Sequence, residues 1–399
     1  MCDTLCSVGP SGTLFGKNSD RPRDEVQVVE THPARRGKGP LRTTYLELDD
    51  TGAYALVGSR PTWMWGFEHG CNEHRVVIGN ERIFTIDDPR RAPPALTGMD
   101  LVRLGLERSR SADEAIAVMT ELLERYGQGG RCAEHEDDPY WSSFLVADPD
   151  GAWVLETSDR TWAARAVDDG AAISNRVTLG TDWTRASADV ERGADFDTWR
   201  DPRVPTVPAD DRLAATSSCI TARSRALTPA DVASTLRHHG DRPWGAPGTD
   251  PGDWSPPPTH LDAELHGFTV CFHVNEPGFI VETTTSSMIA ELPRDRDAPP
   301  RAWFALGSPC ASVYIPAFPP EEVPSALASV ATWRRFAMLR DRAEADPTAL
   351  GEIRAVLGPA ETQLWGHADA IAATDAESRT RLVAKEWEIV DAALVRLGV

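Results

Sequence analysis

The sequence predicts an α+β protein in which layered sheets pack against helices. Short apolar segments separated by Gly, Pro, Asn and Asp recur over residues 3–58, 143–176 and 268–316, a pattern typical of β-hairpins. Helical periodicity is confined to separate blocks, at residues 97–126, 228–236 and beyond 324. Because the strands and helices are grouped rather than alternated, an α+β architecture is favoured over a parallel α/β sheet.

Composition limits the classes of partner. The 399 residues suggest one large domain or two to three smaller ones, and a hydrophobic fraction of 41% is enough for a substantial core. A net charge of −20 argues against nucleic-acid binding, which needs clustered Lys and Arg. No apolar run approaches the roughly 18–20 residues that span a membrane. We therefore expect neither a nucleic-acid nor a membrane partner.

The cysteines indicate a reducing compartment. There are seven, an odd number without a CxxC pair, and the start of the chain lacks the pattern of a signal peptide. Reduced thiols in a cytoplasmic protein account for this best.

The first predicted strand pair brings reactive side chains close to one another. Residues 4–8 are expected to form a strand, residues 9–12 a turn and residues 13–16 the start of a returning strand, which leads to Lys17 and Asp20. A hairpin places the end of its second strand beside the start of its first. Lys17 and Asp20 should therefore lie close to Cys2.

Cys2 has a special position. Methionine aminopeptidase removes Met before small residues, so we expect Cys2 to become the first residue. It would carry a thiol with a pKa of about 8.5 and an α-amine with a pKa of about 7.7–8.0. One residue could then supply both nucleophile and general base. Position alone favours the interpretation of Cys2 as an ordinary second residue, and only its surroundings favour the catalytic interpretation.

The following segments predict further strands and helices. Residues 44–48 and 54–58 suggest a second hairpin, and residues 61–67 contain Trp63 and Trp65, which belong either to the core or to a pocket wall. Asn80 ends an apolar strand over residues 76–79, where it could donate to an oxyanion or simply end the strand. Helices are expected over residues 97–108 and 111–126.

The middle of the chain predicts another sheet. Residues 143–147 and 152–156 form a clear hairpin pattern, and residues 162–166 and 171–176 add two strands, the second of which contains Asn175 near its end. Residues 131–141 combine Cys132 and His135 with acidic side chains, but their spacing matches no metal-ligand template. We expect a solvated acidic loop there, and neither a metal nor a cofactor.

The second half mixes loops with a helical end. Residues 182–211 are expected to form a loop, and residues 217–226 contain Arg223 and Arg225. A helix capped by Thr228 should follow to about residue 236, then a Pro-rich loop or lid over residues 240–259. Residues 268–274 and 278–284 suggest a hairpin, residues 303–316 a last strand region, and the chain beyond 324 several helices.

Several ordered blocks resemble a known family. Cys2-Asp3-Thr4, followed by Phe-Gly-Lys-Asn-Ser-Asp-Arg over residues 15–21, is similar to the start of the secernins and cysteine-type dipeptidases. These belong to the N-terminal-nucleophile hydrolases. The resemblance continues through residues 63–66, 70–81, 98–108, 153–157 and 309–314 and so covers nearly the whole chain. Such ordered blocks are more specific than any single motif.

The resemblance implies a fold and an activity. It implies a four-layer αββα sandwich over residues 2–320, with Met1 removed, and a helical extension over 321–399 packed on the same domain. The implied activity is that of a cysteine dipeptidase that cleaves short peptides through a Cys2 thioester. Alternatives are an amidase or acyltransferase acting on acyl-amines, or a non-catalytic regulatory binding protein. The partner is then a small peptide or acyl-amine, and the oligomeric state stays open, with a homo-oligomer as one option.

The resemblance also implies roles for single residues. Cys2 attacks the carbonyl and its α-amine takes the thiol proton, while Asp20 orients this amine and Lys17 adds positive charge. Asn80 and Asn175 match positions that bind near the nucleophile in related hydrolases, and both are expected to stabilise the oxyanion.

Two points about the site stay open. An Arg reaches the active site of related hydrolases, and Arg223, or else Arg225, is the candidate here, although the local motif is loose. A Cys–His dyad is a rival mechanism, because His273 or His74 could reach Cys2.

Overall fold

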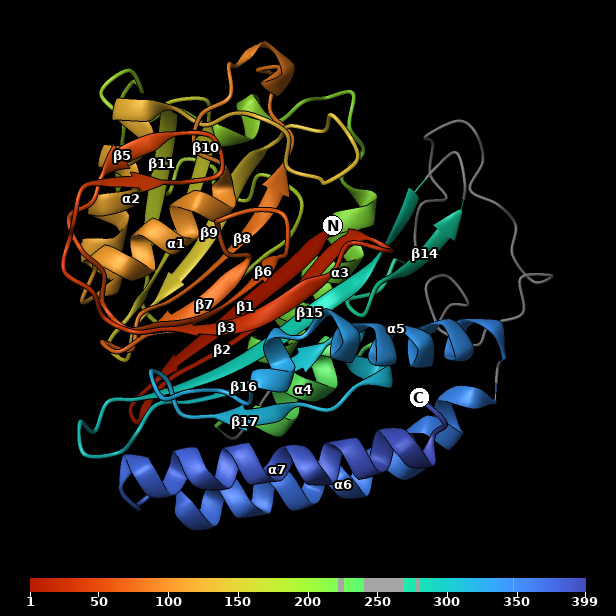
Figure 1. The fold of residues 1–399 in the computed structure, drawn as a ribbon. Helices are drawn as coiled ribbons and strands as arrows, with labels where there is room; N and C mark the ends of the chain where they lie inside the picture. Colours follow the sequence, from red (N-terminus) through yellow and green to blue (C-terminus); the bar gives the residue numbers. More distant parts are fainter. Residues whose placement is uncertain (222–225, 240–267, 277–279, 347) are drawn as a thin grey trace.

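The computed structural model describes residues 1–221, 226–239, 268–276, 280–346 and 348–399. Two large antiparallel sheets face each other (Figure 1). The seven-stranded sheet has the order β12 (Gly170–Ile173), β1 (Cys2–Gly9), β2 (Gly12–Pro22), β15 (Ile280–Pro293), β16 (Arg301–Leu306) and β17 (Ile315–Ala317), with β14 (His273–Glu276) also paired to β15.

The second sheet has eight strands. Their order is β13 (Arg185–Ala186), β11 (Thr161–Val167), β10 (Ala152–Ser158), β9 (Trp141–Ala147), β8 (Val77–Ile83), β7 (His69–Asn72), β6 (Leu56–Pro61) and β3 (Gln27–His32).

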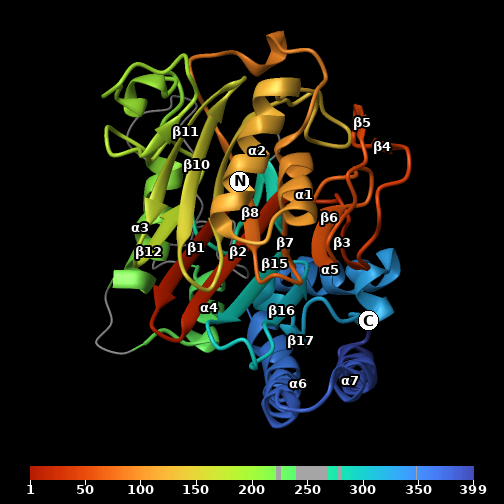
Figure 2. The ribbon, with the colours of Figure 1, turned by 90° about the vertical axis from the view of Figure 1, so that its left-hand side faces the viewer.

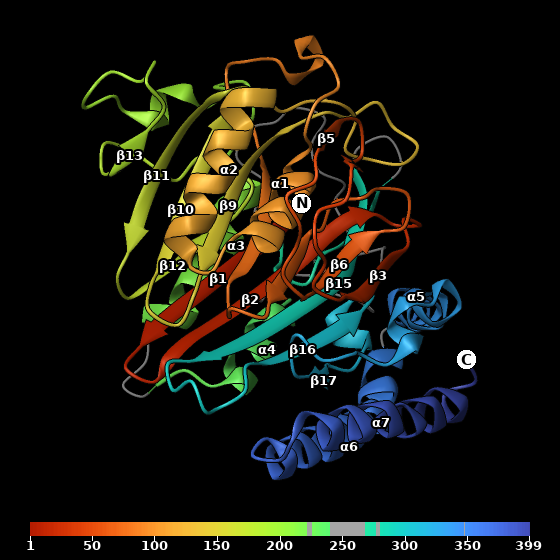
Figure 3. The same cartoon turned by 60° about the vertical axis from the view of Figure 1, so that its left-hand side comes forward.

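Helices cover both outer faces, as Figures 2 and 3 show from two sides. On the eight-stranded sheet lie α1 (Gly98–Arg108) and α2 (Ala112–Tyr126), and on the seven-stranded sheet lie α3 (Val207–Thr221) and α4 (Pro229–Leu236). The chain ends in α5 (Val330–Ala345), α6 (Ala349–Ile371) and α7 (Ala376–Arg396). The four-layer αββα sandwich with a helical C-terminal region is confirmed. Its division at residue 320 stays a prediction.

The central strands are buried on both faces, because each lies between the opposite sheet and a helical layer. On β1, Cys6 belongs to the core between the sheets, whereas Leu5 packs beneath α3 and α4. On β15, Met288 belongs to the core between the sheets, and Ile289 packs on the side of α3 and α4. Alternation of side chains along a strand explains this division.

The first hairpin forms as expected. Gly12 lies in the turn with a φ of +134°, and a Cβ atom there would come within 2.1 Å of the Leu292 carbonyl oxygen. The register pairs Cys2 with Ser19, so Asp20 lies next to the start of β1. On the other side of β2, β15 pairs Thr284 with Asp20, and its register shifts between Thr284 and Ser286. Such bulges are common beside active sites.

Two sequence expectations were wrong. Residues 44–48 and 54–58 do not pair with each other: β5 (Glu47–Asp49) pairs with β4 (Pro40–Arg42), while β6 pairs with β3. The buried strand β6 joins the large sheet, and β5 stays largely exposed. In addition, residues 207–211 begin α3 instead of ending a loop. The buried residues of α3 include Arg212 and Thr216, so this helix has no apolar stripe to reveal it.

The remaining expectations on strands and helices are mostly confirmed. The helices over 97–126 and 228–236 form as α1, α2 and α4, and the hairpin of residues 143–156 forms as β9 and β10. β12 departs from its sequence neighbours and pairs with β1 in the other sheet. The seven cysteines, all within the described ranges, are free thiols. Among the described helices, none combines the length and the apolar character needed to cross a bilayer.

Glu386 in α7 gives a prediction about pH. Neither of its buried carboxyl oxygens has a hydrogen-bond partner in the part of the chain that the structure describes, although His367 Nδ1 lies 3.7 Å from Oε1. Burial raises the pKa of this carboxyl group to about 8. An unfolded glutamate loses its proton near pH 4.3 (an approximate value). Folding therefore takes up a proton between about pH 4 and pH 8, and this group lowers stability as pH rises through that window.

We expect Glu386→Gln to flatten this part of the pH dependence and to raise the melting temperature at pH 8 relative to the unchanged chain. The exposed Glu377→Gln, on the same helix, is the control and should leave the profile unaltered. Parallel melting curves of Glu386→Gln and the unchanged chain across the window would contradict the assignment.

Candidate active site at the start of β1

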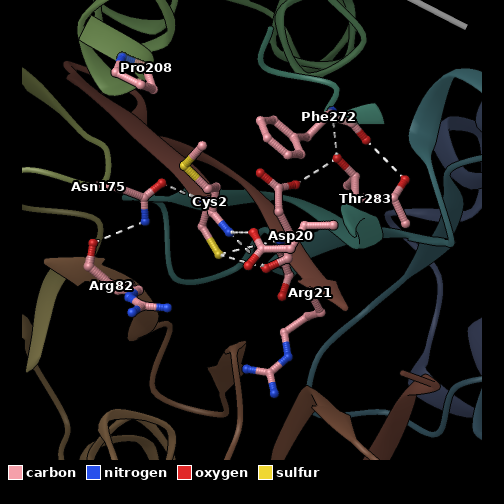
Figure 4. Close-up of polar contacts among 12 residues, drawn as sticks. Cys2, Asp20, Arg21, Arg82, Asn175, Pro208, Phe272 and Thr283 are labelled. Atoms are coloured by element: carbon pink, nitrogen blue, oxygen red, sulfur yellow. Dashed lines mark hydrogen bonds and ion pairs between the residues drawn. The ribbon is translucent and has the colours of Figure 1, made fainter. Parts of the chain in front are cut away.

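Cys2 lies in a buried position at the start of β1, with 6% of its surface exposed. Its backbone nitrogen donates a hydrogen bond to Asn175 Oδ1 at 2.8 Å, and the backbone N–H of Asp20 donates to Cys2 Sγ at 3.4 Å. Figure 4 shows Cys2 between Asn175 on one side and Asp20 on the other. The sequence prediction that the sulfur and Asp20 lie close together therefore agrees with the geometry.

The two carboxyl oxygens of Asp20 differ in their hydrogen bonds. Its Oδ1 atom accepts a hydrogen bond from Thr284 Oγ1 at 2.7 Å, whereas its buried Oδ2 atom has no hydrogen-bond partner among the described residues. Arg212 Nη1 lies 3.8 Å from Oδ2. Burial raises the pKa of Asp20 to about 7, because the charged form is poorly solvated.

Arg212 is the site residue that sequence reasoning missed. It extends from α3, is fully buried, and pairs with Asp3 Oδ2 at 2.8 Å. Its guanidinium also donates to the Cys2 carbonyl oxygen at 3.2 Å and to Asn175 Oδ1 at 2.7 Å. A further N–H donates to the carbonyl oxygen of Pro208, one turn earlier in α3, at 2.9 Å. One guanidinium thus connects the main chain of Cys2 to a helix of another layer.

Arg223, the arginine that the sequence suggested, lies outside the described residues, as does Arg225. One signal could have pointed to Arg212. Asp3 occupies a strand that is otherwise buried, and a carboxylate in such a place needs a cation. The sequence did not indicate which Arg supplies it, because no helix was expected over residues 207–221.

Lys17 lies on β2, fully buried, opposite Thr4. Its Nζ atom donates to the Asn18 carbonyl oxygen at 3.3 Å and lies 3.7 Å from Glu68 Oε2. Gly79 makes room for it, since a Cβ there would come within 2.6 Å of Lys17 Cδ. Burial raises the pKa of the Cys2 thiol, and the charge of Lys17 opposes this effect.

The two asparagines are differently engaged. Asn175 Oδ1 accepts from Cys2 and Arg212, while its Nδ2 donates to the Arg82 carbonyl oxygen at 3.0 Å. With its amide oriented to satisfy both ends, Asn80 donates to Glu68, to the main-chain oxygen at 2.9 Å and to Oε2 at 3.0 Å. Asn175 therefore keeps one N–H free of these contacts, whereas both N–H groups of Asn80 are directed at Glu68.

Cys2 opens into a small cavity of about 40 Å³, lined by residues that include Asp20, Asn80, Arg82, Tyr140 and Glu282. Met1 occupies part of this region. Its α-ammonium pairs with the Glu282 carboxylate and donates to the Asp20 carbonyl oxygen at 3.2 Å. A larger cleft of about 810 Å³, lined by Asp87 and Arg160 among others, contains none of the predicted site residues.

The Cys–His dyad does not form in this structure. No histidine lines the cavity beside Cys2 within the described part of the chain. His273 instead faces Cys271, Cys310 and Glu344, and His74 packs edge-on against Tyr54. Of the predicted residues, the fold thus brings together Cys2, Lys17, Asp20, Asn80 and Asn175, and their roles stay predictions.

A family model, Peptidase family C69, matches residues 69–187. These residues are therefore similar to members of that family. The matched segment comprises the strands β7 to β13, the helices α1 and α2, and Asn175, which follows β12. The match supports the expected hydrolase that acts on amide bonds.

Solved structures show a weak likeness to the chain. Penicillin V acylase from Agrobacterium tumefaciens is 12% identical, with a TM-score of 0.44 over 76% of this chain and 83% of that chain. The C2A mutant of conjugated bile acid hydrolase from Clostridium perfringens is 11% identical, with a TM-score of 0.41 over 76% of this chain and 88% of that one.

The buried network gives a prediction about stability. We expect Arg212→Met to destabilise the protein by about 3–5 kcal/mol, because it leaves the Asp3 carboxylate buried without its cation. Adding Asp3→Asn should recover part of this loss. Arg125→Met, an exposed arginine of α2, is the control and should stay within about 0.5 kcal/mol in chemical denaturation. Equal stability of Arg212→Met and Arg125→Met would contradict the network.

Proposed function

We propose that the protein is a cysteine amidohydrolase whose nucleophile is Cys2, exposed as the first residue by removal of Met1, and that its substrates are dipeptides. One observation carries the proposal. The nitrogen and the sulfur of Cys2 are both held by one buried network, through Asn175 and the main chain of Asp20. If Cys2 had no catalytic role, its backbone nitrogen would not need to be held by the amide of Asn175, which is itself held by the buried Arg212.

Removal of Met1 turns the Cys2 nitrogen into an amine, and the surroundings suit one. Asn175 Oδ1 already accepts from this nitrogen at 2.8 Å. Asp20 Oδ2 is buried, has no hydrogen-bond partner within the described ranges of the chain, and is available as a second acceptor. Both oxygens would orient the lone pair of the amine, so that it can take the proton of the neighbouring thiol.

The reaction then follows in two stages. Cys2 Sγ attacks the substrate carbonyl while the α-amine takes the thiol proton and passes it to the leaving amine, which leaves a thioester on Cys2. Water, deprotonated by the same amine, attacks the thioester, and Cys2 recovers its proton as the acid departs. Lys17, whose charge lowers the thiol pKa, favours the thiolate in both stages.

The oxyanion needs N–H donors. Asn175 keeps an N–H beyond its bond to Arg82 and is the better placed of the two predicted amides. Asn80 lines the cavity, but must turn its amide away from Glu68 before it can donate. Losing one such donor typically costs about 10²–10³ in rate.

The position of Glu282 favours dipeptides over acyl-amines as substrates. In the unprocessed chain this carboxylate binds the α-ammonium of Met1 directly beside Cys2. Once Met1 has left, a half-buried carboxylate faces the vacated position, and an α-ammonium on the substrate would restore its partner. An N-acylated substrate lacks this charge, so the amidase alternative leaves Glu282 unpaired.

We expect intact-mass measurement to find the purified chain without Met1 and, after incubation with a dipeptide library, a thioester adduct on Cys2. Cys2→Ala should abolish both the adduct and turnover. Cys6→Ser, another buried cysteine of β1 that lies in the core between the sheets, is the control and should retain the adduct. A folded protein that keeps Met1 would exclude this mechanism and favour a non-catalytic binding role. Full turnover by Cys2→Ala would exclude Cys2 as the nucleophile.

Glu282→Gln should raise KM for dipeptides by about tenfold or more, since a charge-assisted hydrogen bond to the substrate is lost. The kcat should change little. The matched control is the same dipeptide with its amine acetylated, for which both forms of the enzyme should perform equally. If the acetylated dipeptide is the better substrate of the unchanged enzyme, the acyl-amine amidase is the correct alternative.

A further inference from the structure

A cluster of nitrogen and sulfur groups lies apart from the cavity of Cys2. It comprises His239 just after α4, Cys271 just before β14, His273 at the start of β14, and Cys310 in the short 3-10 helix η4 (Pro309–Ala311). One ligand atom from each residue lies within 4.8 Å of the other three. Cys271, His273 and Cys310 are buried, and His239 is half-buried. The proposed amidohydrolase uses none of these four side chains.

The spacing of these atoms matches the coordination shell of a metal. His273 Nε2 lies 3.4 Å from Cys271 Sγ and 3.3 Å from Cys310 Sγ. Around a tetrahedral Zn²⁺ with ordinary bond lengths, a histidine nitrogen and a cysteine sulfur are about 3.5 Å apart. Both sulfurs therefore already lie at the separation from the imidazole that shared coordination requires.

The tautomer of His273 fits a metal ligand. Its Nδ1 atom faces Glu344 Oε1 of α5 at 2.8 Å, so the ring proton belongs on Nδ1 and the lone pair of Nε2 points toward the two thiols. Metal-bound histidines typically donate their other N–H to a carboxylate in this way. Glu344 is itself held by an ion pair with Arg23.

His239 supplies an independent observation. Its Nε2 atom is buried and has no hydrogen-bond partner among the described residues. Its ring lies against that of His273, with 5.5 Å between the ring centres. A buried imidazole nitrogen without a partner is costly unless an unseen partner, such as a metal, satisfies one of the ring nitrogens.

We propose that His239, Cys271, His273 and Cys310 bind one Zn²⁺ ion in a closed tetrahedral site. Two thiolates and two imidazoles are the ligand set that Zn²⁺ prefers over the hard cations Mg²⁺ and Ca²⁺, which bind oxygen. Binding releases the two thiol protons and leaves the site without net charge, which suits its burial. Because four protein ligands fill the shell, the ion is structural and has no open position for a substrate.

The site would fasten the segment behind the candidate active site. Phe272 lies between Cys271 and His273 in the chain, and its N–H donates to Thr284 Oγ1 at 2.9 Å. Thr284 in turn donates through the same hydroxyl to Asp20 Oδ1 at 2.7 Å. Figure 4 shows Phe272 beside Thr283, whose hydroxyl donates to the Phe272 carbonyl oxygen. The ion would hold the end of α4, β14 and η4 together, and through Phe272 it would position Asp20.

The test measures metal in the full-length protein. We expect chain purified from zinc-supplemented cells to contain about one zinc per molecule by elemental analysis. After exchange with Co²⁺, the spectrum should show the thiolate charge-transfer and intense d–d bands of tetrahedral sulfur coordination. Cys310→Ser should lose both signals. Cys219→Ser, a buried cysteine of α3 outside the cluster, is the matched control and should retain them.

Glu344→Gln keeps all four ligands and is the variant to measure if Cys310→Ser does not fold. We expect it to weaken zinc binding by about 10–100-fold in competition with a chelator, because the carboxylate no longer orients His273. A metal-free unchanged chain that does not take up zinc on titration would overturn the proposal. So would a disulfide between Cys271 and Cys310 in the native protein, found by mass spectrometry.

Discussion

The buried guanidinium of Arg212 is the interaction on which the geometry of the site depends. It joins the Asp3 carboxylate, the Cys2 carbonyl oxygen and the Asn175 amide, and so fixes the start of β1 to α3 and to the end of β12. A buried ion pair adds little net stability, but breaking one is costly, because the remaining charge stays buried. Such a pair therefore enforces one arrangement of the strand end.

The same burial sets the electrostatics around Cys2. Lys17, Asp20 and Glu81 are almost completely buried near the strand end, and burial raises the pKa of Asp20 to about 7 and that of Glu81 to about 8. Carboxyl groups with pKa values near neutrality are typical of functional sites. Removal of Met1 would take one positive charge from its position and create another on Cys2, a single residue away, so the balance of charge would be largely kept.

Zinc and catalysis would occupy separate but connected parts of the fold. Phe272, which lies between the proposed ligands Cys271 and His273 in the chain, is linked to the Asp20 carboxyl group through the hydroxyl of Thr284. A register shift in β15 directly follows Thr284 and directs the next hydroxyl, that of Thr285, to Gln27 and the main chain of Ser19. The hydroxyl-rich part of β15 thus supports the site through hydrogen bonds instead of taking part in it.

Local pattern by itself determined the first hairpin, the helices α1, α2 and α4, and the closeness of Cys2, Lys17 and Asp20, because each of these depends on turn residues, caps or a short antiparallel register. Only the tertiary structure decided the partners of β6 and β12, the helix α3 with Arg212, and the gathering of His239 with Cys271, His273 and Cys310. These depend on contacts between residues distant in the chain. A buried arginine or a lone histidine has the same appearance in the sequence whether or not the fold gives it a partner.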